Sequence, residues 1–309
     1  MLPPLPNPFP PSVHTVGVFA PAGPLEADPL ARGIARLHGW GLEVIVEHTP
    51  DCRDRFLAAP DSERLAAIER LVRNPQVDVL LAARGGYGCG RILDRIDWHG
   101  FAKRNVPIIG FSDITALLLT ALTTGARNGI FGPMLCGLFA REPTTDPEVE
   151  NVRFSFDAFA RAWHGGDVLL PPGQTLQTLK PGKASGPLVP ATLAVLTSLL
   201  GTPFLPSLRG AILVIEDVNE AAYRVDRYLT HLRAAGILAE LGGLVFGSFS
   251  NGDDAEWLPS VFAEFARYVQ GPVASGLPMG HCFPCVSLPV GRNGMLEADT
   301  GGARLGIGP

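Results

Sequence analysis

Short apolar runs alternate with amphipathic segments along the first part of the chain. Apolar runs of about four to eight residues are typical of buried strands, and apolar residues at helical spacing between them are typical of helices. The predicted strands are residues 14–20, 42–46, 77–83 and 106–111, and the predicted helices are 30–38, 61–73 and 114–122, with a helical or irregular connection at 94–104. Strands that alternate with helices and are buried on both faces form parallel, doubly wound sheets, so we expect an α/β domain here.

The pattern changes near residue 140. Pro, Gly and Thr become frequent over the next 45 or so residues, and we predict a linker there with one Trp-containing helix near 158–163. Further on, the pattern predicts helices at 192–200, 220–235 and 258–269, strands at 211–215 and 243–249, and a Gly/Pro-rich end with short strands. The expected organisation is a loose Pro-rich leader at 1–12, an N-terminal domain at 13–140, a linker at 141–185 and a C-terminal domain at 186–309.

Composition narrows the class of protein. The 309 residues suffice for two domains, and 46% hydrophobic with 18% charged residues is typical of a well-packed globular protein. A net charge of −5 argues against a nucleic-acid partner. No apolar run reaches the roughly 18 residues that cross a bilayer, so no membrane partner is expected. The start MLPPLPNPFPP lacks the features of a signal peptide, which favours a cytoplasmic location, and five cysteines do not resemble a disulfide framework.

Ser112 lies where the predicted strand 106–111 passes into the predicted helix 114–122. In α/β proteins such a turn exposes a nucleophile, because it lifts the side chain out of the sheet beside the free N–H groups of the helix start. Asp113 and Thr115 are placed to start the helix. Ser is also a favoured N-cap residue, so the local pattern alone leaves open whether Ser112 is a nucleophile or a helix cap.

A Gly-rich segment, RGGYGCG at residues 84–90, follows the predicted strand 77–83. Glycine lets the backbone approach a ligand closely or adopt a positive φ. Because the carboxyl ends of parallel strands meet at one edge of the sheet, we expect this loop to lie beside Ser112. A phosphate loop and a plain turn are the alternatives, but the spacing matches neither a P-loop nor a dinucleotide fingerprint.

A carboxylate ends the predicted strand 211–215. Burying the Glu216 carboxylate in that position costs free energy unless the carboxylate is paired or lies at an open site. Asp217 and Asn219 follow it and are good caps for the next helix.

One histidine stands in a Gly/Pro-rich loop, where His281 precedes Cys282 and Cys285. The Cys-x-x-Cys spacing permits a redox pair or a metal site, but zinc takes about four ligands and no second Cys/His pair has a suitable spacing. Together with Ser112 and Glu216, His281 supplies the parts of a catalytic triad, in which a base takes the serine proton and a carboxylate fixes the base. The Gly-rich loop and the N–H of Asp113 are candidates for an oxyanion hole. Composition alone would not select these residues.

Six segments resemble one known family in the same order along the chain. They are ARGGYGCGRIL (83–93), IIGFSDITALL (108–118), FGPM (131–134), LLGTP (199–203), ILVIEDVNEAAYRVDRYLTHL (212–232) and LPMGH…LPVG (277–291). The family is that of the LD-carboxypeptidases, or muramoyltetrapeptide carboxypeptidases, which are serine peptidases and include the microcin C self-immunity hydrolases. The resemblance covers most of the chain from residue 14 onward.

The resemblance implies a fold and a reaction. It implies a flavodoxin-like parallel-sheet N-terminal domain and a smaller, β-rich, barrel-like C-terminal domain, with the triad split between them. The implied reaction is the metal-free, cofactor-free hydrolysis of the L,D-peptide bond that holds a terminal D-alanine on a cytoplasmic murein tetrapeptide. Members are commonly dimers, so a homodimer with a murein peptide as substrate is expected.

The resemblance also implies residue roles. Ser112 would be the nucleophile, His281 the general base and Glu216 its orienting carboxylate, and the backbone N–H groups of Gly86 and Asp113 would hold the oxyanion. Arg84 is our own candidate for binding the free carboxylate of the substrate, since a guanidinium can do so with two hydrogen bonds. An interface salt bridge is an equally good interpretation of Arg84.

Three departures from the family pattern leave the substrate open. Phe131 stands where the family has His in His-Gly-Pro-Met, PATL at 190–193 stands for Gly-Gly-Asn-Leu, and Cys282 stands for a Gly after the histidine. None removes a triad member. The rival functions are a microcin-immunity hydrolase acting on a peptidyl-nucleotide, for which this chain has less room for nucleotide-binding insertions, and a non-catalytic protein that binds a small ligand.

Overall fold

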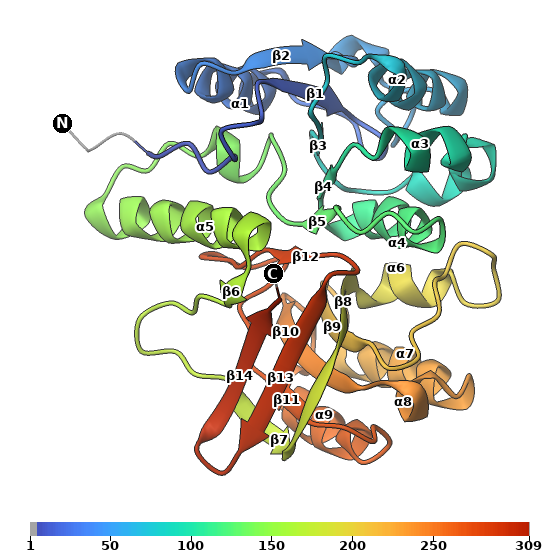
Figure 1. Ribbon diagram of the computed structural model, residues 1–309, viewed down its shortest axis with the longest axis vertical. Coiled ribbons are helices and arrows are strands. Elements are labelled where there is room, and N and C mark those ends of the chain that lie inside the picture. Colours follow the sequence, from blue (N-terminus) through green and yellow to red (C-terminus); the bar gives the residue numbers. More distant parts are fainter. Residues whose placement is uncertain (1–4, 309) are drawn as a thin grey trace.

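Two β-sheets organise the molecule in the computed structural model, which describes residues 5–308 (Figure 1). The first sheet has the order β12-β5-β4-β3-β1-β2. Its parallel strands are β1 (Thr15–Phe19), β2 (Glu43–Val46), β3 (Val79–Ala82), β4 (Ile108–Gly110) and β5 (Ile130–Phe131). The strand order 2-1-3-4-5 is that of flavodoxin-like folds, in which ligands bind at the carboxyl ends of the strands. The expected doubly wound sheet is confirmed.

Helices cover both faces of the first sheet. They are α1 (Ala27–Gly39), α2 (Asp61–Arg73), α3 (Trp98–Arg104), α4 (Thr115–Thr123) and α5 (Asp146–His164). Alternate residues of β3 face opposite cores: Leu80 packs with the side chains of α2, α3 and α4, whereas Leu81 packs with those of α1 and α5. A strand buried on both faces must be apolar throughout, which is why its sequence shows a continuous apolar run.

Two segments differ from the sequence prediction. The helix predicted near 158–163 is present, but α5 is longer, with 19 residues from Asp146, and it buries Val152, Phe156 and Phe159 against the first sheet. The segment expected to be a loose leader also packs, since Phe9 lies 5.8 Å from Phe139 and 5.4 Å from Phe159, ring centre to ring centre. That prediction is wrong for residues 5–12, and its first four residues lie outside the described part of the chain.

The second sheet has the order β6-β14-β13-β8-β9-β10-β11-β7. Its strands are β6 (Gly166–Asp167), β7 (Gln177–Lys180), β8 (Gly182–Thr192), β9 (Ile212–Val218), β10 (Gly243–Ser250), β11 (Val273–Ser275), β13 (Asn293–Asp299) and β14 (Gly302–Ile307). Leu176, next to β7, forms an antiparallel bridge with Ala303 of β14, which brings the ends of the sheet together. The expected β-rich, barrel-like unit is confirmed. Its helices are α6 (Leu193–Ser198), α7 (Ala222–Ala234), α8 (Ile237–Glu240) and α9 (Leu258–Ala266).

A short strand from the last part of the chain joins the two sheets. β12 (Leu288–Pro289) pairs antiparallel with β5 at the edge of the first sheet, and the following strands β13 and β14 belong to the second sheet (Figure 1). The segment just before β12, which contains His281, is therefore held near the edge where β4 and β5 end.

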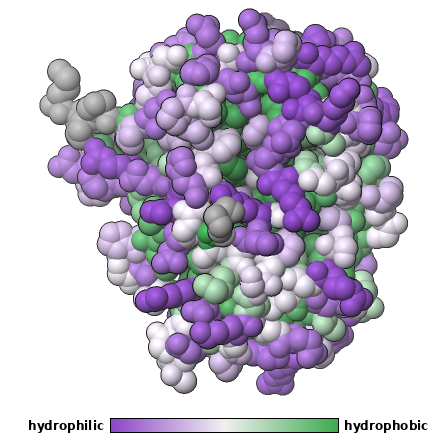
Figure 2. All heavy atoms as spheres, in the orientation of Figure 1, coloured by the Kyte–Doolittle hydropathy of each residue, from purple (hydrophilic) through white to green (hydrophobic). Residues whose placement is uncertain are grey.

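The molecular surface agrees with the composition. Hydrophilic side chains dominate the face in Figure 2, and hydrophobic ones are scattered between them. Among residues 5–308, no helix combines the length and the apolarity that a membrane span requires.

Candidate active site

Ser112 occupies a strained turn at the end of β4. It opens a 3₁₀ turn, Ser112–Ile114, that leads directly into α4, and its φ is +63°. Residues other than glycine rarely adopt this left-handed backbone conformation, because it costs them on the order of 1 kcal/mol. Neither the turn nor α4 has a side-chain cap. The helix-cap interpretation of Ser112 is therefore wrong, and the strained turn resembles that of exposed nucleophiles.

The Gly-rich loop lies directly against this serine, as expected from the strand order. A Cβ atom at Gly85 would come within 2.8 Å of Ser112 Cβ and 3.0 Å of its Oγ, so a larger residue there would displace the hydroxyl. Gly86 has a φ of +124°, which favours glycine. The Gly23 N–H donates to Gly85 O at 3.1 Å and fixes the loop from the β1 side.

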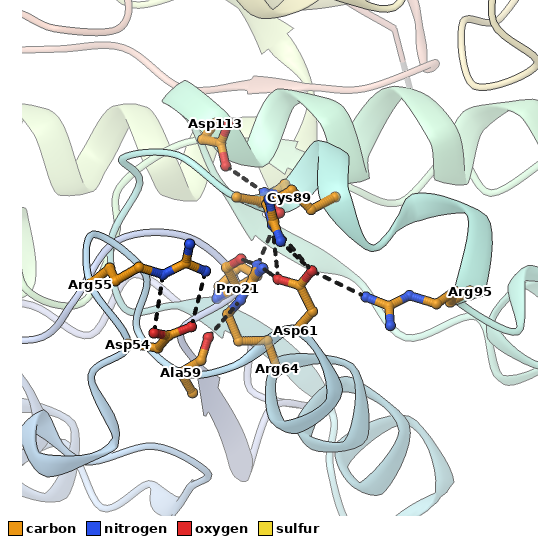
Figure 3. Close-up of polar contacts among 11 residues, drawn as sticks. Pro21, Asp54, Arg55, Ala59, Asp61, Arg64, Cys89, Arg95 and Asp113 are labelled. Atoms are coloured by element: carbon orange, nitrogen blue, oxygen red, sulfur yellow. Dashed lines mark hydrogen bonds and ion pairs between the residues drawn. The ribbon is translucent and has the colours of Figure 1, made fainter.

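Polar contacts centred on Asp113 and Arg64 hold the Gly-rich loop in place (Figure 3). Asp113 Oδ2 accepts a 2.8 Å hydrogen bond from Cys89 N–H, so this carboxylate links the turn that holds Ser112 to the Gly-rich loop rather than capping a helix. The fully buried Arg64 donates to Gly88 O at 3.0 Å, to Ala59 O at 3.1 Å and to Pro21 O, and it pairs with Asp61. The sequence pattern does not reveal the role of Arg64, because an arginine in an amphipathic helix is usually exposed.

Glu216 and His281 contact each other as the triad hypothesis requires. Glu216 is fully buried within β9, two residues before the strand ends at Val218, and its Oε2 lies 2.8 Å from His281 Nδ1 and 3.0 Å from the His281 backbone N. Because a carboxylate only accepts, the side-chain contact requires a proton on Nδ1, which leaves Nε2 as an acceptor. Gly280 has a φ of +89°, and a Cβ there would lie 2.2 Å from Glu216 Cδ. This position therefore requires glycine.

Thr192 is a site residue that the sequence analysis did not identify. Its hydroxyl donates to Glu216 Oε1, and its N–H donates to Thr115 Oγ1 at 3.2 Å. Both oxygens of the buried carboxylate are thus hydrogen-bonded, which offsets the cost of its burial. A signal was present in the sequence, since Thr192 lies in the PATL segment that departs from the family pattern.

Asp217 and Asn219 do not cap the following helix, contrary to the prediction. α7 begins after Ala221, without a side-chain cap. Asp217 accepts from Ala194 N–H at 2.8 Å and from Val218 N–H at 2.9 Å. Burial raises the pKa of Asp217 to about 7 despite these hydrogen bonds.

Ser112 and His281 line the same cavity, of about 360 Å³. Arg84, Gly85 and Gly86 line it as well, so the structure brings together most of the residues predicted from the sequence. Arg84 donates to Pro24 O at 3.0 Å, which holds its side chain at the cavity wall. A second cavity of about 730 Å³ lies next to the first and shares five lining residues with it, among them Phe111, Met134 and His281; we call the two cavities together the cleft.

An aromatic pair supports His281 from inside the molecule. The Phe111 ring lies 4.9 Å from the His281 ring in an edge-to-face arrangement, and the Phe131 ring lies 5.8 Å from that of Phe111. Phe131 is buried at the end of β5. This departure from the family pattern therefore places an apolar ring behind the residue that contacts the candidate base.

The Cys-x-x-Cys segment has no features of a reactive or metal-binding pair. Cys282 and Cys285 are both free thiols. Burial raises the pKa of Cys282 to about 11 and that of Cys285 to about 12, so both remain protonated near neutral pH. Over residues 5–308, no group of three or more His, Cys, Asp or Glu side chains is arranged to hold a metal ion.

Comparisons with known proteins agree with this fold. The model of the LD-carboxypeptidase N-terminal domain matches residues 16–132, and that of the C-terminal domain matches residues 185–296. The murein tetrapeptide carboxypeptidase of Pseudomonas aeruginosa is 32% identical over 292 residues, which are 92% of this chain and 93% of the relative. The probable murein peptide carboxypeptidase of Bacillus subtilis is 34% identical, over 92% of this chain and 88% of the relative.

Solved structures lead to the same assignment. The muramoyltetrapeptide carboxypeptidase of Oxalobacter formigenes has a TM-score of 0.81 at 29% identity, over 96% of this chain and 99% of the other. The microcin C7 self-immunity protein MccF has a TM-score of 0.86 at 22% identity, over 99% of both chains, and shares the fold. These matches define the chain as a peptidase. It belongs to the LD-carboxypeptidase family and is a carboxypeptidase.

Proposed function

We propose that this protein is a serine carboxypeptidase that releases the terminal D-alanine from murein tetrapeptides in the cytoplasm by cleaving an L,D-peptide bond. The observation that carries the proposal is the contact between Glu216 and His281 in a cleft that also contains Ser112. The names of the relatives from Pseudomonas aeruginosa and Bacillus subtilis, and of the Oxalobacter formigenes enzyme, support murein peptides as the substrate class.

The proposed mechanism uses the side chains in sequence. Ser112 Oγ attacks the carbonyl carbon while His281 Nε2 takes its proton, and Glu216 stabilises the imidazolium that forms. The N–H groups of Gly86 and Asp113 hold the oxyanion, since Asp113 is within the first turn of a helix where N–H groups are free. His281 then gives the proton to the amine of D-alanine, which leaves. Water hydrolyses the acyl-enzyme by the same steps, with no metal or cofactor.

Arg84 is proposed to bind the carboxylate of the departing D-alanine. Arg84 lines the cavity of about 360 Å³ that contains Ser112, and this cavity is the smaller part of the cleft. We further propose that the protein acts as a homodimer.

Mass spectrometry of the purified protein with a murein tetrapeptide, with and without a chelator, tests the proposal. Loss of one alanine that the chelator leaves unchanged is the expected result. Cleavage of a peptidyl-nucleotide but not of the tetrapeptide would instead identify an immunity-type hydrolase. Saturable binding of the tetrapeptide without cleavage would identify a non-catalytic binder, and chelator-sensitive cleavage would contradict the metal-free mechanism.

A further inference from the structure

The larger part of the cleft contains a guanidinium that the proposed reaction does not use. Arg141 lines the cavity of about 730 Å³ together with His281 and Phe283. Its Cζ lies 3.8 Å from the centre of the Phe283 ring, so the guanidinium stacks on the ring. Arg36 donates to the Arg141 carbonyl and holds the backbone at this point.

The charge of Arg141 is compensated only at a distance: hydrogen bonds from Thr144, and to a smaller extent the charge of Arg141, lower the pKa of the Glu148 carboxyl. Between residues 5 and 308, no carboxylate lies within ion-pair distance of its guanidinium. Arg32 lines the same cavity but is differently engaged, since it pairs with Asp28, lies 3.9 Å from Glu142 and donates to Ala140 O at 3.0 Å. Arg141 is therefore the guanidinium in this cavity that is available to a ligand.

Stacking prepares a guanidinium for a planar anion. An aromatic ring contacts the face of the group and leaves the N–H donors at its edge, where they can bind a carboxylate with two parallel hydrogen bonds. The stack also restricts the side chain before a ligand arrives, which lowers the entropy lost on binding.

We propose that Arg141 binds a carboxylate on the acyl side of the substrate, the part that stays on the enzyme after D-alanine leaves. This proposal rests on the proposed function. It divides the cleft between two guanidinium groups, with Arg84 in the smaller cavity beside Ser112 and Arg141 in the larger cavity beyond His281. The larger cavity suits the larger fragment of a tetrapeptide, and that fragment carries the additional acidic groups.

Two carboxylates of a murein peptide could fill this role. One is the side-chain carboxylate of a diaminopimelate at the third position, which a lysine at that position lacks. The other is the α-carboxylate of the γ-linked D-glutamate at the second position, which amidation to D-isoglutamine removes. Both present the same chemistry to Arg141, and substrates that differ in one group at a time distinguish them.

The test uses the wild-type protein and three variants with four tetrapeptides that combine these two differences. Arg141→Met removes the charge and keeps the apolar contact with Phe283. Arg141→Lys keeps the charge but cannot form the bidentate hydrogen bonds of a guanidinium. Arg233→Met is the matched control, because Arg233 also lies over an aromatic ring, that of Tyr268 at 5.0 Å, but lines neither cavity. The readouts are kcat/KM for each tetrapeptide and, by calorimetry, Kd for each tripeptide product, which needs no turnover.

In the wild-type protein, we expect one carboxylate to raise kcat/KM and tripeptide affinity by about 10- to 100-fold over the peptide that lacks it. Arg141→Met should abolish this preference by weakening only the carboxylate-bearing peptides, Arg141→Lys should retain part of it, and Arg233→Met should keep it whole. The proposal would be overturned if Arg141→Met weakened all four peptides equally, or if it weakened no peptide. Tripeptide binding that depends on Arg141, without hydrolysis of any tetrapeptide, would uphold the role of Arg141 and contradict the proposed function. If the protein neither binds the tripeptides nor hydrolyses the tetrapeptides, the role of Arg141 and the proposed function are both contradicted.

Discussion

Glu216 holds His281 at two points, because the same carboxylate oxygen lies 2.8 Å from Nδ1 and 3.0 Å from the backbone N. The double contact fixes the ring and the main chain of the loop together. Gly280 permits it, since any Cβ at that position would overlap the carboxylate. The buried charge thus orients the candidate base and determines which of its nitrogens faces the cleft.

Replacing Glu216 with Gln should separate orientation from charge. The amide has the same shape and can still accept from Nδ1–H, but it does not stabilise an imidazolium. We expect kcat to fall by about 10²- to 10⁴-fold, as expected for neutralising a triad carboxylate. Steady-state kinetics with a murein tetrapeptide measures this, and a variant with wild-type kcat would remove Glu216 from the mechanism.

Two substitutions of Ser112 should affect activity and stability differently. Ser112→Ala and Ser112→Gly should both lose about 10⁴–10⁶ in rate, since a triad acts as a unit. Ser112→Gly should also raise the free energy of unfolding by about 0.5–1 kcal/mol, because glycine relieves the left-handed strain, whereas Ser112→Ala should leave it nearly unchanged. Urea denaturation measures both. Equal stability of the two variants would show that the turn is not strained.

Thr192→Val should impair the site through Glu216. Valine has the same shape but leaves the Glu216 Oε1 atom without a donor, which costs about 1–3 kcal/mol of stability. We expect kcat to fall about tenfold with KM little changed, because the carboxylate becomes less well fixed. Thr192→Ser keeps the hydroxyl and is the control. If Ser and Val variants behave alike, the hydrogen bond does not position Glu216.

Arg64→Met should loosen the Gly-rich loop. It leaves three buried carbonyl groups without their donor, which should cost on the order of 3 kcal/mol of stability. Hydrogen exchange should accelerate at Gly88 and Cys89, and kcat should fall with the loosened oxyanion hole. Arg91→Met removes an exposed partner of Asp61 and should have a much smaller effect. Unchanged exchange at these two amides would show that Arg64 does not support the loop.

Asp217 should make the folded protein less stable as the pH rises. Its pKa is raised to about 7 when folded, whereas an unfolded aspartate titrates near 4. Between these values the unfolded chain has released a proton that the folded chain still binds, so the free energy of unfolding falls from about pH 4 to pH 7 and then levels off. Chemical denaturation across this range measures the slope. Asp217→Asn should reduce it, and an unaltered slope would assign it to other groups.

The sequence predicted the first sheet and the candidate triad for related reasons. Strands such as 77–83 are buried on both faces, so their apolar runs stand out, and strand order then brings their carboxyl ends to one edge. Ser112 follows a strand and His281 lies in a loop, where a polar side chain has no packing role, and Glu216 is a carboxylate buried in the apolar strand β9. The resemblance to a family linked the three, which no local pattern could do.

The elements that the sequence did not predict, or predicted only in part, have local sequences that are not typical of their secondary structure. β8 (Gly182–Thr192) contains Pro187 and Pro190, and proline is usually excluded from central strands. The first part of β8 pairs with β13 and the second part pairs with β9, so its pairing partner changes near these prolines. α5 was predicted only near 158–163, because it begins at Asp146 in a segment that resembles a linker and its apolar face becomes evident only against the first sheet. Thr192 and Arg64 act through partners far away in sequence, and pattern analysis does not detect such pairs.

The segment around β12 also bears on how the protein is made. His281 and the edge strand that completes the first sheet lie together near the end of the described chain, long after Ser112. During synthesis, Ser112 therefore leaves the ribosome well before His281. Under the proposed mechanism, a nascent or prematurely terminated chain carries a serine without its base, and hydrolytic competence requires the segment that adds the last strand to the sheet holding Ser112.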